Sequence, residues 1–250
     1  IGGSNNTNTN NNSVNLIASN RCSNIVHKIV WHENLIITLG LRFIKLWKFD
    51  ENDSNCTGGI SKKPLVLKGK NAILGSLLNG NFIDASILNE DELLVITDTN
   101  QLLALKLNVE NPKLVILKPP EYEFNSIVVD FHYEQVWLST GNNYTIKSIS
   151  FNELVPYNST GGSSNNVIIP LSSKKLITAF TAKDNNNTIS RPIIQIYDFS
   201  KTHLAFLTDQ EEIKFMKKDN SDRDGINEKV LATSLLKNFA GIKYTHLKEF

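Results

Sequence analysis

The stretch Leu35-Ile36-Ile37-Thr38-Leu39-Gly40, followed by a short turn and Phe43-Ile44-Lys45-Leu46-Trp47-Lys48-Phe49, decides the fold of this 250-residue chain. Both halves are rich in β-branched, aromatic and aliphatic residues, which favour extended strands. Two such runs separated by a short turn are typical of a β-hairpin. We therefore predict a hairpin over residues 35–49.

The same hairpin pattern returns three times along the chain. The strand pairs lie at 93–97 and 102–107, at 136–140 and 144–149, and at 176–180 and 193–199. Their first strands start at residues 35, 93, 136 and 176, so the spacings are 58, 43 and 40 residues. A period of about 40 to 45 residues built from strands is typical of β-propeller blades. We expect an all-β chain, a β-propeller of about four to five blades.

Further apolar runs complete these blades. We expect inner strands at 25–31, 82–87 and 127–131, and outer strands at 65–67, 114–117, 167–169 and 204–207. The inner strand of the fourth blade is not evident, and 167–170 is an alternative for it. Inner strands are covered on both faces, which explains continuous apolar runs without strict alternation.

The C-terminal stretch allows two interpretations. Residues 230–236 and 242–247 form a fifth hairpin, or residues 227–239 form a helix with apolar side chains on one face and Gly241 at its end. Either way we expect a piece of a larger ring. More of the same polypeptide, or a partner, would complete the propeller by supplying further strands, because exposed edge strands pair with other chains.

Polar segments separate the predicted strands. Residues 1–15 are Asn-rich and lack the apolar side chains that offset chain entropy, so we expect them to be disordered. The blades then occupy 16–250, with polar inserts at 50–62, 157–166, 184–190 and 217–225. Asn-rich inserts of this kind are a fungal-like feature of composition.

Net charge, the length of apolar runs and the number of cysteines argue against several classes of protein. The net charge of +1 gives no global field for nucleic acid or an acidic membrane, and no apolar run is long enough to span a bilayer. Cys22 and Cys56 are too few for a disulfide framework. We expect an intracellular protein, nuclear or cytoplasmic.

The hairpins resemble blades of the WD-repeat family. The best match is Gly40 to Trp47, where a strand ends in the tryptophan of the family's Trp-Asp pair, and Tyr197-Asp198 stands at the corresponding place of the fourth blade. Residues 39–107 are also similar to the microtubule-associated-protein-like branch, with the glycine-rich segment at 68–75. The resemblance covers residues 25–210 and implies a propeller that binds proteins. The chain departs from the family pattern because it has no Gly-His pair, and Lys48 replaces the family's aspartate.

We find no catalytic, cofactor-binding or metal-binding constellation in the sequence. His27 and His32 lie five residues apart on a strand and therefore point to opposite faces, which is poor geometry for one metal ion. Glu90, Asp91 and Glu92 lack the spacing of a calcium loop, and no phosphate loop or nucleophile elbow is present. We expect no enzymatic activity.

The leading hypothesis is a scaffold that binds proteins within a larger complex through turns and links between blades. We assign the binding rim to Arg42, Asn100, Tyr122 and Tyr144. A nucleic-acid-binding module is an alternative. It would use the lysine clusters at 62–63, 68–70 and 217–218. A third hypothesis is an enzyme with a site in the central channel, which would require converging carboxylates or histidines.

Overall fold

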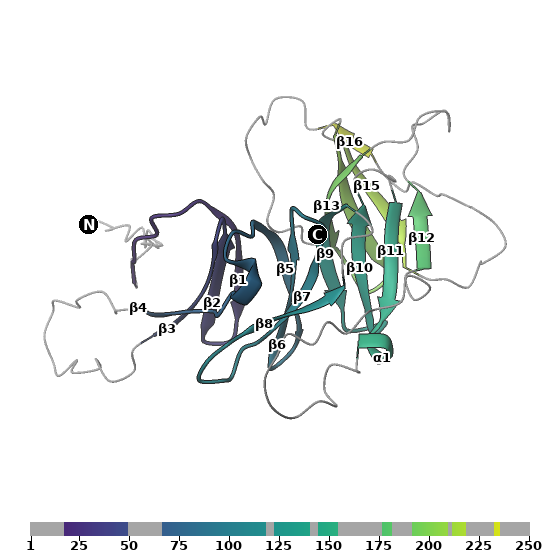
Figure 1. Ribbon diagram of the computed structural model, residues 1–250. Helices are drawn as coiled ribbons and strands as arrows, with labels where there is room; N and C mark the ends of the chain where they lie inside the picture. Colours follow the sequence, from purple (N-terminus) through teal and green to yellow (C-terminus); the bar gives the residue numbers. More distant parts are fainter. Residues whose placement is uncertain are drawn as a thin grey trace, which may run out of the picture.

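The computed structural model describes residues 18–49, 67–118, 123–140, 145–154, 177–181, 192–209, 212–218 and 233–235. These residues form four antiparallel sheets, each with four strands. Figure 1 shows the first three sheets in sequence order across the molecule, and the fourth sheet overlaps the third in this view. Within each sheet, strands that are consecutive in sequence are hydrogen-bonded neighbours. Repeated four-stranded meanders that pack face to face are the blades of a β-propeller.

The blades divide the strands in order. Blade 1 contains β1 (Val26–His32), β2 (Leu35–Gly40), β3 (Phe43–Phe49) and β4 (Leu67–Asn71). Blade 2 contains β5 (Phe82–Asn89), β6 (Glu92–Thr97), β7 (Leu102–Lys106) and β8 (Leu114–Lys118). Blade 3 contains β9 (Phe124–Asp130), β10 (Gln135–Thr140), β11 (Thr145–Ser150) and β12 (Ile177–Thr181). Blade 4 contains β13 (Ile193–Asp198), β14 (His203–Thr208), β15 (Glu212–Lys217) and β16 (Thr233–Leu235). Two short helices, η2 (Gly75–Leu77) and α1 (Phe151–Leu154), follow β4 and β11.

A β-bulge recurs at the start of the first strand of every blade. In β1 the pairing register shifts between Val26 and Lys28, and in β5 it shifts between Phe82 and Asp84. The first strands of blades 3 and 4 carry a register shift at the matching place. A bulge bends its strand and increases its twist. The shared position identifies the four blades as copies of one structural unit.

The first strands pack against one another in the order β1, β5, β9 and β13, and they form the inner side of the blades. Side chains of the second strands fill the space between blades. Leu93 and Val95 of β6 belong to the core shared with blade 1, whereas Leu94 and Ile96 belong to the core shared with blade 3. Both faces of β6 are buried, which explains why its run Leu93 to Ile96 is apolar without alternation.

Blade 1 has one exposed face. Ile29 of β1 is 63% exposed, although its counterparts by register in the other blades, Ala85, Ile127 and Ile196, are at most 3% exposed. Those counterparts are covered by the preceding blade. Among the described strands, none of blade 4 packs on blade 1. The four blades are therefore part of a propeller ring rather than a closed ring.

The prediction for the fourth blade was wrong, because each run was assigned to a strand position two strands away from the one that it occupies. The run at 176–180 and the run at 193–199 do not form a hairpin: Ile177–Thr181 is the outer strand β12 of blade 3, and Ile193–Asp198 is the innermost strand β13 of blade 4. The run at 204–207 is the second strand of blade 4 rather than its outer strand. An outer strand and the next inner strand are also consecutive apolar runs, so the sequence pattern alone does not separate the two arrangements.

Other differences are smaller. The outer strand of blade 1 is Leu67–Asn71, so part of the glycine-rich segment at 68–75 is strand, and residues 65–66 of the strand expected at 65–67 lie outside the described residues. Thr233–Leu235 pairs with β15 as the outer strand of blade 4, and the rest of the alternative hairpin or helix lies outside the described residues. The segment 1–15, the inserts at 50–62, 157–166 and 184–190 and the strand expected at 167–169 also lie outside them. Of the insert at 217–225, only Lys217 and Lys218 are described.

Candidate interaction rim

A chain of polar contacts joins the inner strands of the four blades. Lys28 Nζ on β1 lies 2.6 Å from Asp84 Oδ1 on β5. Asp84 Oδ2 accepts hydrogen bonds from Ser126 Oγ at 2.6 Å and from the Ile127 amide at 3.1 Å, both on β9. Ser126 Oγ in turn accepts a hydrogen bond from the Ile196 amide of β13 at 3.2 Å. One chain of contacts therefore crosses all three boundaries between blades.

The side chains of Lys28, Asp84 and Ser126 form contacts that connect the blades. Asp84 is 4% exposed and Ser126 is fully buried, so neither side chain is open to a substrate. Buried polar groups require partners, and the side-chain oxygens of Asp84 and Ser126 each have at least one. Two further contacts have the same role: the Val129 amide donates to Ser86 Oγ, and Asn125 Nδ2 donates to the Ile193 carbonyl. The contacts of this lysine, aspartate and serine connect the inner strands of neighbouring blades.

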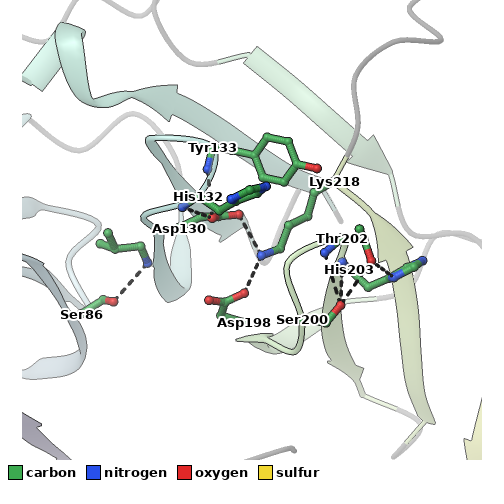
Figure 2. Close-up of polar contacts among 10 residues, drawn as sticks. Ser86, Asp130, His132, Tyr133, Asp198, Ser200, Thr202, His203 and Lys218 are labelled. Atoms are coloured by element: carbon green, nitrogen blue, oxygen red, sulfur yellow. Dashed lines mark hydrogen bonds and ion pairs between the residues drawn. The ribbon is translucent and has the colours of Figure 1, made fainter. Parts of the chain in front are cut away.

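A second ionic cluster lies between blades 3 and 4 (Figure 2). Lys218 Nζ lies 2.8 Å from Asp130 Oδ2 at the end of β9 and 2.5 Å from Asp198 Oδ1 at the end of β13. The side chains of Lys218 and Asp130 are 1% and 2% exposed, whereas that of Asp198 is 47% exposed. Asp130 Oδ1 also accepts hydrogen bonds from the amides of His132 and Tyr133. A buried lysine thus fixes the ends of two inner strands.

Because Lys218 is buried, the lysine cluster predicted at residues 217–218 is not an exposed pair. We expected residues 217–218 to form an exposed basic pair, but only Lys217 is exposed. The ammonium group of Lys218 is engaged with two carboxylates and does not reach the surface. Lys68 and Lys70 of the other cluster are exposed on β4, and Lys62 and Lys63 lie outside the described residues.

Arg42 and Asn100 occupy equivalent turns in neighbouring blades. Arg42 lies between β2 and β3 with φ 64°, and Asn100 lies between β6 and β7 with φ 68°. The Arg42 amide donates a hydrogen bond to the Gly80 carbonyl at 2.8 Å. Asn81, the next residue, accepts from the Asp98 amide at 3.0 Å and donates through Nδ2 to Asp98 Oδ2 at 3.0 Å. The segment between the two blades therefore links the two turns into one continuous rim.

Exposed aliphatic side chains lie on the segments around Arg42. Leu41 is 42% exposed and forms a β-bridge with Asn81, and Leu78 at the end of η2 is 66% exposed. Ile25 is 67% exposed and its carbonyl lies against Gly40, next to Leu41. We call the surface formed by Ile25, Leu41, Arg42, Leu78, Asn81, Asp98 and Asn100 the blade 1–2 rim. The sequence analysis did not single out its aliphatic members, because their exposure depends on the fold.

Two of the four predicted rim residues are therefore placed, and they lie at one edge of the molecule. Tyr122 and Tyr144 fall outside the described residues, so their assignment to the rim stays a prediction. Whether Arg42 and Asn100 bind a partner also stays a prediction.

The side chains of His32, Asp91 and Glu92, which are metal-ligating residue types, have structural contacts. His32 Nε2 lies 3.1 Å from the Glu90 carbonyl, across the boundary between blades 1 and 2. Asn108 Nδ2 donates a hydrogen bond to Asp91, and Asn89 Nδ2 donates one to Glu92. Within the described ranges, no group of three or more His, Cys, Asp or Glu side chains is arranged to hold a metal ion.

Cys22 is exposed as a free thiol. No helix in the described part of the chain is long and apolar enough to cross a membrane.

Comparison with known proteins gives only general relationships. No protein-family model matches the chain, and no curated protein matches it. Among solved structures it is similar to Kluyveromyces lactis Hsv2, with 13% identity, a TM-score of 0.46, and 86% of this chain and 58% of that chain covered. It is also similar to the Myceliophteria thermophila Cps50 (Swd1) β-propeller domain, with 10% identity, a TM-score of 0.48, and 79% and 57% covered. A third is the computationally designed Ika4 protein, with 10% identity, a TM-score of 0.44, and 82% and 98% covered.

The chain spans between 52% and 61% of the natural propeller chains in this comparison. Because the identities and TM-scores are low, the assignment to the β-propeller class rests on the blade order and the repeated bulge. These structures give no support to the narrower similarity to the microtubule-associated-protein-like branch.

Proposed function

We propose that this chain is a WD-repeat-like, non-enzymatic scaffold that binds proteins through the blade 1–2 rim within a larger intracellular complex, nuclear or cytoplasmic. The observation that carries the proposal is the group of exposed aliphatic side chains next to Arg42, on turns held by hydrogen bonds between two blades. Arginine is enriched in binding hot spots, and exposed apolar side chains grouped on one surface mark interaction sites. Such a rim also loses little conformational entropy on binding.

The buried chemistry of the chain supports a scaffold over an enzyme with a channel site. The inner strands do bring a carboxylate, a lysine and a serine together, but Asp84, Lys28 and Ser126 are engaged with one another and with backbone amides. A catalytic group must reach its substrate within hydrogen-bond distance. The polar residues of the inner strands instead stabilise the boundaries between blades.

Quantitative affinity purification from cells of the source organism tests the proposed rim. The test variant carries Leu41→Asp, Arg42→Ala and Leu78→Asp, and the control carries Val109→Asp. Val109 is 40% exposed on the loop between β7 and β8, at the other end of the strands. We expect the rim variant to lose partners that wild type and control retain. Full retention of every partner by a folded rim variant would contradict the proposal.

Alanine substitution at the four residues assigned from the sequence, Arg42, Asn100, Tyr122 and Tyr144, is a second test. It includes Tyr122 and Tyr144, which lie outside the described residues. If all partners stay bound to this variant while the aliphatic variant loses them, the binding site is the aliphatic patch and the tyrosines do not contribute.

Nucleic-acid binding is the alternative function. Lys48 of β3 is paired in register with Lys68 of β4, and both side chains are exposed on the outer part of blade 1. Adjacent lysines on one surface are the electrostatic feature that phosphate binding needs. Binding of labelled RNA or DNA that weakens steeply between low and moderate salt would favour this alternative.

The similarity to the microtubule-associated-protein-like branch also stays a prediction, which co-sedimentation with microtubules would test.

A further inference from the structure

The face of blade 1 that is turned away from blade 2, which we call the rear face, carries exposed apolar side chains. Ile29 and Trp31 of β1 are 63% and 67% exposed. They are two residues apart on one strand, so their side chains lie on the same face. Trp31 is paired in register with Ile36 of β2, which is partly buried on this face. Exposed apolar patches of this kind mark contact surfaces.

The matching face of each other blade is covered by the blade that precedes it in sequence. By register, Ile36 corresponds to Leu93 in blade 2, Val136 in blade 3 and Leu204 in blade 4, and all three are fully buried. Each shares a core with apolar side chains from the second and third strands of the preceding blade. These are Ile37, Leu39 and Leu46 for Leu93, then Leu94, Ile96 and Ala104 for Val136, and Trp137 and Ile146 for Leu204. The three boundaries show that the apolar side of another blade fits a rear face.

Two of these boundaries also place a side-chain oxygen on a backbone amide just after the bulge of the first strand. A bulge disrupts the local ladder of hydrogen bonds between strands. In blade 3 the amide of Ile127 donates to Asp84 Oδ2 of blade 2 at 3.1 Å. In blade 4 the amide of Ile196 donates to Ser126 Oγ of blade 3 at 3.2 Å. Asp84 and Ser126 stand at the same position of their blades, directly after the bulge, so the acceptor comes from one place in the preceding blade.

Blade 1 has a lysine where blades 2 and 3 have this acceptor. Lys28 stands directly after the bulge of β1, and an ammonium group cannot accept a hydrogen bond. The Ala85 amide of blade 2 donates instead to Asp84 Oδ1 of its own blade at 2.9 Å. The matching amide of blade 1 is that of Ile29, and among the described residues no side chain accepts a hydrogen bond from it. Because Lys28 precedes Ile29, blade 1 cannot supply its own acceptor as blade 2 does.

We propose that a further blade of the same polypeptide covers the rear face of blade 1 and carries an oxygen-bearing side chain directly after the bulge of its first strand. Its second and third strands cover Ile29 and Trp31 with apolar side chains. Its oxygen accepts the hydrogen bond of the Ile29 amide, which burial would otherwise leave without a partner. The same polypeptide is the source because, at all three described boundaries, both blades belong to one chain. The rear face is separate from the blade 1–2 rim, so either proposal can fail while the other stands.

Hydroxyl-radical footprinting of the native polypeptide, purified from cells of the source organism, tests whether the face is covered. The chain has three tryptophans, and Trp47 and Trp137 are buried at 5% and 0% exposure. We expect Trp31 to be oxidised more slowly in the native than in the denatured protein by the same factor as these two. Leu78, which is 66% exposed, is the unprotected reference. Oxidation of Trp31 at the same rate in the native and the denatured protein would overturn the proposal.

The variant Ile29→Glu tests whether the protection comes from this face. It should remove the protection of Trp31 and leave Trp137 protected, whereas the control Val109→Glu should leave both protected. If Ile29→Glu also exposes Trp137, the chain has unfolded, and Ile29→Ala replaces it with a smaller expected loss of protection at Trp31. Protection of Trp31 that neither substitution lowers would contradict the proposed contact.

Photo-crosslinking identifies what covers the face. A photoreactive amino acid replaces Trp31 in the native polypeptide, and mass spectrometry identifies the crosslinked peptide. We expect a crosslink within the same polypeptide, to the second or third strand of another blade whose first strand has an oxygen-bearing residue directly after its bulge. The same group at Val109 should not reach that peptide. A crosslink to a different protein, or to a blade with an apolar or basic residue at that position, would overturn the proposal.

Discussion

Ser126 Oγ donates a hydrogen bond of 2.6 Å to Asp84 Oδ2, and this contact joins the inner strands of blades 2 and 3 at buried positions 42 residues apart. Ser126 also accepts a hydrogen bond from the Ile196 amide, so the same hydroxyl reaches blade 4. The buried serine and aspartate therefore form a hydrogen-bonded network that links the inner strands of blades 2, 3 and 4. Here the network runs between blades rather than within one blade.

Removing the carboxylate of Asp84 should strongly destabilise the fold. In Asp84→Ala, the Ile127 amide and the Ser126 hydroxyl lose their acceptor and Lys28 loses its ion-pair partner. We expect the free energy of unfolding to fall by about 3–5 kcal/mol, as for other broken buried ion pairs. The measurement is chemical denaturation monitored by tryptophan fluorescence. Lys28→Met is the matched control: the buried carboxylate loses its counter-charge but keeps its hydrogen bonds from Ser126 and Ile127, so we expect a clearly smaller loss than for Asp84→Ala. Equal effects of the two variants would contradict this account.

Lys218 should be a second point of high sensitivity. Lys218→Met leaves the buried carboxylate of Asp130 without its counter-charge, which we expect to cost about 3–5 kcal/mol of unfolding free energy. Asp198→Asn removes the exposed partner instead, and solvent screening should limit its effect to about 1 kcal/mol or less. Thermal unfolding of both variants checks the order. A larger loss in Asp198→Asn than in Lys218→Met would show that the buried pair does not anchor blade 4.

Two glycines of blade 1 should differ in their tolerance of alanine. A Cβ at Gly40 would lie 2.0 Å from the Ile25 carbonyl oxygen, so backbone would have to move. A Cβ at Gly69 would lie 2.3 Å from Lys45 Cε and 2.7 Å from the Trp47 ring, so two side chains, but no backbone atoms, would have to shift. We expect Gly40→Ala to cost about 1–3 kcal/mol, with Gly69→Ala less destabilising. Denaturant midpoints for the two variants measure this, and the reverse order would refute the close approach of residues 25 and 40.

The local hairpins could be predicted from the sequence, and their assignment to blades could not. The hairpins at 35–49, 93–107 and 136–149 are correct because alternation of apolar residues and turns is a local signal. The hairpin assigned to 176–199 is wrong, because a link between blades and a turn within a blade look alike in sequence. What distinguishes them is tertiary contact, such as the hydrogen bond from Asn125 of β9 to Ile193 of β13.

The candidate site was predictable only in part, for a similar reason. Arg42 and Asn100 stand out because they occupy turns, and the structure places both there with left-handed backbone. The exposure of Leu41 and Leu78 could not be predicted, since an aliphatic residue near a strand end is usually buried. The burial of Lys218 was missed because its two carboxylate partners are 88 and 20 residues away in sequence (218 − 130 and 218 − 198).

Hydrogen–deuterium exchange of the chain, alone and with its co-purified partner, would locate the binding surface. We expect binding to slow exchange in peptides that contain Leu41–Arg42, Leu78–Asn81 and Asp98–Asn100. Peptides from the loop around Val109, at the other end of the strands, should be unchanged. Protection confined to that loop, or to the inner strands around Asp84 and Ser126, would contradict the assignment of the blade 1–2 rim as the binding surface of a scaffold.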